Sequence, residues 1–205
     1  MDKTDLKTEI ALDLHKTGAL KFGEFTLKSG VVSPMYMDLR LFVSYPDTLK
    51  KVAKALSQII SPLKFDRLAG VAYGALPIAA AISLEMNEPW IYMRKEGLAK
   101  GYGLRKAIEG KYNKGDVVVV IDDLVFRGDS KLEVIEPFEN AGLKINDFVV
   151  LIDYEQGAAK TLREKGKNLH SLLKMKEVID IMKRHKKIDE SEYKTCVEFL
   201  SRKPA

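Results

Sequence analysis

The stretch Val117-Val118-Val119-Val120-Ile121-Asp122-Asp123 decides how the chain folds. Five consecutive β-branched residues predict a strand, and successive side chains of a strand point to opposite faces, so both faces have to be buried. A strand covered on both sides is typical of a parallel sheet between two layers of helices. The two carboxylates that close the apolar run are costly to bury without partners. The stretch therefore predicts a doubly wound α/β fold with a polar site at the end of this strand.

The rest of the chain alternates between short apolar runs and helical periodicity. Further strands are expected at residues 67–71, 90–94, 148–152 and 169–173, and helices at 46–60, 77–86, 131–141 and 158–165. This alternation predicts a mainly parallel sheet flanked by helices. The order of the elements agrees with the fold class that the valine strand indicates.

The two ends of the chain depart from this alternation. Residues 5–20 show apolar side chains at four-residue intervals, which predicts an amphipathic helix, and two short extended segments at 24–27 and 35–39 predict a small antiparallel hood element. We expect a single domain over residues 1–185, with the hood inside residues 1–45. Residues 186–205 are expected to form a helical extension that packs on the body or on a partner.

Composition excludes several classes of protein. The chain has 205 residues, of which 46% are hydrophobic and 31% charged, and this suits one globular domain. A single cysteine, Cys196, excludes an internal disulfide, and the first residues lack the apolar core of a signal peptide, so a cytoplasmic protein is expected. Glycine and proline interrupt the longest uncharged stretch, 68–84, so no membrane span is expected.

Charge gives little support for a nucleic-acid partner. The net charge is +5, but 34 basic residues are offset by 29 acidic ones. The one dense basic run, 183–187, closes a predicted helix, where cations are favoured by the helix dipole. The three histidines are too far apart to form a local metal motif.

Ligands of open α/β sheets bind beyond the carboxyl ends of the strands, which draws attention to residues 122–130. A ribose diol or hydrated magnesium would satisfy the two carboxylates. A turn and a helix cap are the alternative, because Asp129 or Ser130 can accept a hydrogen bond from the first free N–H groups of a helix. This stretch alone leaves both interpretations open.

A long segment, 95–114, contains glycines and many charges but little apolar periodicity. Loops of this length in a compact domain are typically functional or mobile. A solvated surface loop is the alternative interpretation of its basic residues.

Four motifs, taken in order, resemble the orotate phosphoribosyltransferase family of the type I phosphoribosyltransferases. They are Phe22-Gly23-Glu24-Phe25-Thr26-Leu27-Lys28-Ser29-Gly30 with Ser33-Pro34-Met35-Tyr36, then Gly70-Val71-Ala72-Tyr73-Gly74-Ala75-Leu76-Pro77, then Arg94-Lys95-Glu96 with Lys100 and Tyr102-Gly103, and finally Ile108-Glu109-Gly110. The resemblance runs in unchanged order from about residue 14 to residue 180.

The resemblance implies transfer of a phosphoribosyl group from phosphoribosyl pyrophosphate to N1 of orotate, giving orotidine monophosphate and pyrophosphate. Mg²⁺ would arrive with phosphoribosyl pyrophosphate and have no direct protein ligand. The implied catalytic residues are Lys100, Asp122 and Asp123, with the two aspartates on the ribose hydroxyls; the implied pyrophosphate-side residues are Lys28, Tyr73, Arg94, Lys95 and Lys100, and the base-side residues are Tyr36 and Tyr154. A homodimer is implied too, because the family's mobile loop reaches into the neighbouring subunit's site. A pyrimidine-pathway protein is a further implied partner.

The phosphate-binding loop departs from the family pattern. Small hydroxyl and glycine residues are usual there, but this chain has Phe126-Arg127-Gly128-Asp129-Ser130, of which only Gly128 and Ser130 conform. Phe126 removes a hydroxyl donor, and Asp129 adds a negative charge beside a phosphate dianion. Two like charges about 4 Å apart repel by roughly 4 kcal/mol at an effective dielectric constant of about 20, and Arg127 offsets part of this repulsion.

A second departure lies on the base side. The family has an arginine that engages orotate where this chain has Tyr154, and a tyrosine cannot form a charged fork to a carboxylate. We read this change as independent of the first.

With two substrate contacts replaced, weak or absent orotate transferase activity is the leading hypothesis. A fully active enzyme with an unusual phosphate loop, a silent regulatory paralogue and a transferase for another, uncharged base stay open as alternatives.

Overall fold

The computed structural model describes residues 3–26, 30–94 and 108–202. Lys28, Lys95 and Lys100, three of the expected site residues, lie outside these ranges. The elements, in chain order, are α1 (Lys3–Lys16), β1 (Leu20–Thr26), β2 (Val32–Met37), the 3₁₀-helix η1 (Leu39–Ser44), α2 (Pro46–Ile60), β3 (Arg67–Val71), α3 (Ala75–Met86), β4 (Trp90–Met93), β5 (Ile108–Glu109), β6 (Val117–Val125), α4 (Asp129–Asn140), β7 (Lys144–Asp153), α5 (Ala158–Glu164), β8 (Asn168–Lys174), α6 (Met175–Arg184) and α7 (Glu190–Ser201).

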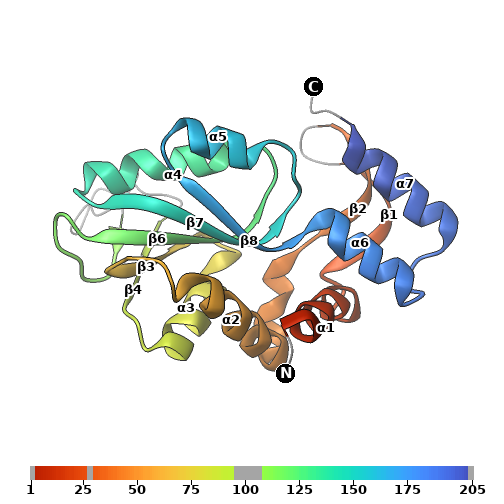
Figure 1. Ribbon diagram of the computed structural model, residues 1–205, viewed down its shortest axis with the longest axis horizontal. Coiled ribbons are helices and arrows are strands. Elements are labelled where there is room, and N and C mark those ends of the chain that lie inside the picture. The colour runs from red at the N-terminus through yellow and green to blue at the C-terminus, as the bar shows by residue number, and fades with distance from the viewer. Residues whose placement is uncertain (1–2, 27–29, 95–107, 203–205) are drawn as a thin grey trace.

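The valine strand β6 lies inside the main sheet. In the described part of the chain the strand order is β5-β4-β3-β6-β7-β8, and every neighbouring pair is parallel except β4 with β5. Figure 1 shows α4 and α5 on one face of this sheet and α2 and α3 on the other. The expected doubly wound, mainly parallel α/β fold is confirmed.

Alternate residues of β6 serve two different cores. Val118 and Val120 pack with Phe138 of α4 and Phe148 of β7, whereas Val119 and Ile121 join the larger core on the face of α2 and α3. All of these side chains are almost fully buried. This burial on both faces explains the run of β-branched residues, because each side chain packs against an apolar layer on its own face of the sheet.

The hood is a two-stranded antiparallel hairpin, as expected, formed by β1 and β2. Figure 1 shows α7 beside this hairpin at one end of the molecule, and α7 packs against both β2 and α6. The amide of Gln156, after β7, donates to the Leu200 carbonyl at 2.7 Å. Residues 190–201 therefore pack on the body of the same chain.

Several element boundaries differ from the sequence expectation. α1 ends at Lys16, not at residue 20, because Gly18 takes a left-handed conformation (φ 74°) and Leu20 already pairs with Met37. β6 extends through Asp122 and Asp123 to Val125, because it pairs with β7 as far as Asp153. The acidic pair therefore lies within the strand and not after it.

Replacing Phe138 by alanine tests the packing between α4 and the sheet. Phe138 is fully buried, so Phe138→Ala should lower the free energy of unfolding by about 3–5 kcal/mol through lost burial and a new cavity. Leu84→Ala is the control, because the Leu84 side chain is 85% exposed, and its effect should stay within about 0.5 kcal/mol. Urea denaturation measures both, and equal effects would contradict this description of the core.

Candidate active site

Asp122 is held in a buried ion pair. Its carboxylate contacts the Lys131 ammonium of α4, and Asp122 and Lys131 are only 6% and 4% exposed. The other Asp122 oxygen accepts the Asp123 backbone N–H at 2.8 Å. The ion pair joins the first turn of α4 to β6, and it neutralises one of the two adjacent carboxylates.

Asp123 is the second carboxylate of the pair and has a different environment. Burial and the neighbouring Asp122 raise the pKa of Asp123 to about 7. A Cβ added to Gly74 would overlap the Asp123 carboxylate. A larger residue here would displace the Asp123 side chain, so the expected pyrophosphate-side loop between β3 and α3 lies directly against the acidic pair.

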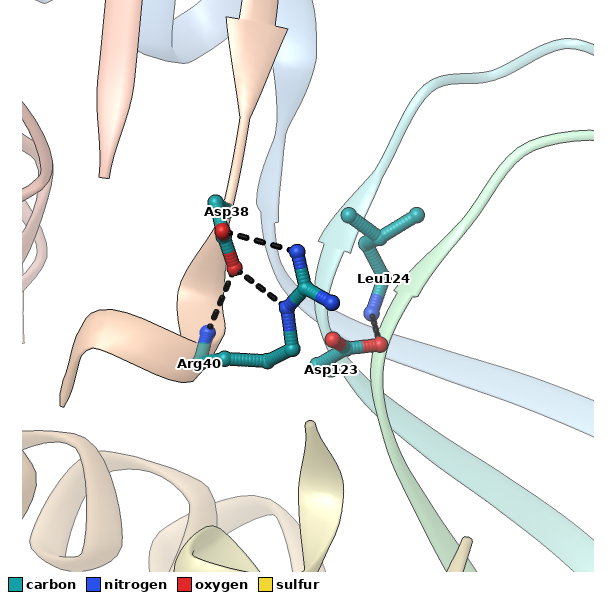
Figure 2. A network of polar contacts seen from close by, with 4 residues as sticks. All are labelled: Asp38, Arg40, Asp123 and Leu124. Atoms are coloured by element: carbon teal, nitrogen blue, oxygen red, sulfur yellow. Dashed lines mark hydrogen bonds and ion pairs between the residues drawn. The ribbon is translucent and has the colours of Figure 1, made fainter. Parts of the chain in front are cut away.

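Arg40 approaches Asp123 from the hood side. Its Nε and Nη2 atoms donate to the Asp38 carboxylate at 2.7 and 2.8 Å, and Figure 2 shows the guanidinium between the carboxylates of Asp38 and Asp123. The Arg40 guanidinium lowers the pKa of Asp38, and Asp38 in turn raises the pKa of Arg40, with smaller contributions from Tyr36 and Asp123. The Tyr36 ring lies 5.6 Å from the Phe25 ring, between centroids.

The phosphate loop begins directly after β6. Gly128 has a left-handed conformation (φ 96°) and precedes α4 as its N-cap, with no side-chain capping hydrogen bond. The alternative interpretation of this stretch, a cap by Asp129 or Ser130, is therefore wrong, because both residues already belong to the helix. Their side chains and that of Arg127 are exposed, so three polar groups surround the start of α4.

Phe126 and Tyr154 are in direct contact. Their ring centroids lie 5.2 Å apart with a tilt of 55°. Burial raises the pKa of the Tyr154 hydroxyl, and the Asp123 charge adds to this shift. Reading the two departures from the family pattern as independent was therefore wrong, because the loop after β6 and the loop after β7 bring them together.

Of the remaining expected residues, Tyr73 lies in the loop after β3, Arg94 follows β4, and Lys28, Lys95 and Lys100 lie outside the described ranges. Tyr73 precedes Gly74 and is 56% exposed. Arg94, at the end of β4, makes an ion pair with Glu109 of β5 at 2.6 Å. Within the described ranges, no three histidine, cysteine, aspartate or glutamate side chains gather into a metal-binding group, and no helix is long and apolar enough to cross a membrane.

Sequence reasoning missed Lys131 and Arg40. A signal for Lys131 was present, because two adjacent carboxylates on an apolar strand call for a cation nearby. Arg40 follows the quoted hood motif by only four residues. Its approach to Asp123 depends on how the hood packs on the sheet, which no local pattern indicates.

The comparisons with known proteins place this geometry in a family. Residues 43–186 match the phosphoribosyl transferase domain family. An orotate phosphoribosyltransferase of Pyrobaculum calidifontis is 38% identical over 190 residues, which cover 92% of this chain and 97% of the relative. The chain belongs to the orotate phosphoribosyltransferase family.

Two longer relatives extend the similarity beyond the Pyrobaculum protein. The structure of Leishmania donovani UMP synthase superimposes with a TM-score of 0.87 at 40% identity, covering 95% of this chain and 42% of that one. The bifunctional enzyme PyrF/PyrE of Nostoc is 37% identical, covering 90% of this chain. This chain spans about two fifths of the length of these two relatives.

The raised pKa of Asp123 makes stability depend on pH. The folded chain keeps a proton on Asp123 that the unfolded chain releases, so this stabilising contribution is complete below the ordinary carboxyl pKa near 4 and is lost as pH rises through about 7. Asp123→Asn should therefore raise the melting temperature at pH 8 by roughly 3–6 °C, for a gain of about 1–2 kcal/mol, and change it little at pH 4. Thermal melting at both pH values measures this difference.

Glu136→Gln, an exposed carboxylate on α4, is the control for removal of a charge and should show no such pH-dependent gain. A destabilised Asp123→Asn variant at pH 8 would count against the raised pKa.

Proposed function

We propose that the chain is an orotate phosphoribosyltransferase of pyrimidine biosynthesis with weakened turnover. The observation that carries the proposal is the placement of Asp123, whose carboxylate lies between the Gly74 loop and the Arg40 guanidinium. The reaction joins N1 of orotate, which loses its proton to solvent, to C1 of the ribose, and the electron pair of the broken C1–O bond leaves with pyrophosphate.

The acidic pair has divided roles in this reaction. Asp123 accepts hydrogen bonds from the ribose hydroxyls as positive charge develops on the ribose ring. Asp122, fixed by Lys131, holds the Asp123 backbone through its 2.8 Å hydrogen bond and so acts as a positioning residue. A carboxylate held this way is preorganised for the transition state.

Basic groups stabilise the departing pyrophosphate. Arg94 is the described member of this set, and its half-exposed guanidinium stands at the end of β4. Lys28, Lys95 and Lys100 complete the set by resemblance to the family, and Tyr73 flanks the Gly74 loop. Cations that close over the leaving group offset the negative charge it gains.

Mg²⁺ would enter the site together with phosphoribosyl pyrophosphate. A single carboxylate of intermediate exposure, Asp123, fits an ion held mainly by substrate oxygens and water, and Mg²⁺ commonly keeps such ligands. When bound, the ion supplies charge neutralisation at the pyrophosphate.

Weakened turnover follows from the Phe126–Tyr154 contact. Phe126 offers no hydroxyl to the 5′-phosphate, and its ring contacts Tyr154, which offers no charged fork to the carboxylate of orotate. The two aromatic residues replace polar contacts at both ends of the same product, orotidine monophosphate. Because the two side chains are in contact, the losses at the two ends are coupled and do not simply multiply in rate.

Assembly and location belong to the same proposal. We expect a cytoplasmic homodimer, and large exposed apolar side chains in and after η1, including Val43 and Tyr45, supply a surface for a second copy. A pyrimidine-pathway enzyme is the expected further partner, because one relative is the bifunctional enzyme PyrF/PyrE, of which this chain covers only 38%.

Restoring both polar contacts should increase activity. Phe126→Thr with Tyr154→Arg should raise kcat/KM for orotate and phosphoribosyl pyrophosphate at least about tenfold over the unaltered chain, since each recovered contact to a charged group is worth about 1.5–3 kcal/mol. Each single change should raise kcat/KM by less than half of the combined effect in free energy, because it leaves the other aromatic residue of the contact in place. The loss of orotate absorbance with Mg²⁺ present measures the rates.

Phe65→Thr is the matched control, because Phe65 is a partly buried phenylalanine at the amino end of β3, whereas Phe126 and Tyr154 follow the carboxyl ends of β6 and β7. It should not raise the rate. Higher activity in the unaltered chain than in the double variant would contradict the proposed weakening. If the chain turned over uracil but not orotate, uracil would be the substrate in place of orotate.

A further inference from the structure

Arg40 is held in a fixed position at the base side of the site. The Asp38 backbone N–H donates to the Ala19 carbonyl at 2.7 Å, and the Asp38 carboxylate accepts both the Arg40 backbone N–H at 3.1 Å and the two guanidinium contacts. Asp38 also caps η1. Three hydrogen bonds to one carboxylate leave the Arg40 side chain little freedom.

The Arg40 guanidinium has N–H donors that Asp38 does not use. An arginine side chain carries five N–H donors, and Asp38 takes two of them. The Arg40 side chain is 64% exposed, so its other N–H groups are open to a ligand. Figure 2 shows the guanidinium between Asp38, which its Nε and Nη2 atoms face, and Asp123 on its other side.

The surroundings of Arg40 suit a planar anion. Arg40 follows Tyr36, one of the two expected base-side tyrosines, by four residues, and Figure 2 shows its guanidinium beside Asp123. Asp123 itself is the carboxyl that would hold the ribose, which places a base joined to that ribose beside Arg40. A planar fork of donors matches a carboxylate on a flat ring.

We infer that Arg40 binds the carboxylate of an anionic pyrimidine base, the contact that Tyr154 cannot make. This inference rests on the proposed function, because it names the residue that recognises the substrate of that reaction. The inference also treats the two ends of the product differently. The base end has a charged contact from Arg40, whereas the phosphate end has Phe126 in place of a hydroxyl donor.

Calorimetry of Arg40→Gln with orotate, in buffer with Mg²⁺ and pyrophosphate, tests the inference. The orotate Kd should rise roughly 10- to 100-fold, because a charge-assisted pair of hydrogen bonds is lost. The Kd for uracil, which has no carboxylate, should change less than about threefold. Arg163→Gln, an exposed arginine on α5, is the matched control and should leave both Kd values unchanged.

Rescue distinguishes recognition from a structural role. Adding Tyr154→Arg to Arg40→Gln should recover most of the lost orotate affinity, since it supplies a guanidinium from the opposite loop, and a merely misfolded hood would not respond. Arg40→Lys keeps the charge without the fork and should show an intermediate loss. If Arg40→Gln melts at a much lower temperature than the unaltered chain, Arg40→Lys replaces it in the comparison of orotate with uracil.

The outcomes separate this inference from the proposed function. No binding of orotate by the unaltered chain overturns both. Orotate binding that Arg40→Gln and Arg40→Lys leave unchanged overturns the role of Arg40 alone, and so does an equal loss of affinity for orotate and uracil.

Discussion

The ion pair between Lys131 and Asp122 is the interaction on which the site depends. The valine strand is buried on both faces, so a carboxylate within it requires a cation of equal burial. Lys131 provides that cation from the first turn of α4 and thereby fastens the helix to the strand. The eight residues between Asp122 and Lys131 comprise Asp123, the phosphate loop and the start of α4. Their path is fixed at both ends by one buried contact.

Asp123 gains its chemical character from the same arrangement. With Asp122 paired, Asp123 is the carboxyl that faces the Gly74 loop on one side and Arg40 on the other. Its raised pKa reflects burial beside a second carboxylate. The contact of Phe126 with Tyr154 joins the two neighbouring loops by an aromatic pair. Under the proposed function, the site keeps the family's carboxylate at the ribose and has altered contacts at the phosphate and the base.

Sequence patterns predicted the elements well, because each reflects local burial: the β-branched run of β6 and the four-residue periodicity of α2 both have an apolar layer to meet. They failed where tertiary pairing decides the result. β6 continues through its two aspartates because β7 pairs with it to Asp153, and α4 starts at Asp129 because Gly128 turns the chain. The meeting of Phe126 with Tyr154 joins residues from two different loops, so no periodicity indicates it.

The stability of Lys131→Met tests most directly whether the buried ion pair organises the site. Removing Lys131 alone leaves Asp122 buried and uncompensated, which should lower the free energy of unfolding by about 3–5 kcal/mol. Adding Asp122→Asn should recover at least half of this loss, while Lys160→Met, an exposed lysine of α5, should cost little. Urea denaturation at pH 7 measures all three variants. A loss below about 1 kcal/mol for Lys131→Met, or a double variant no more stable than the single one, would contradict the account.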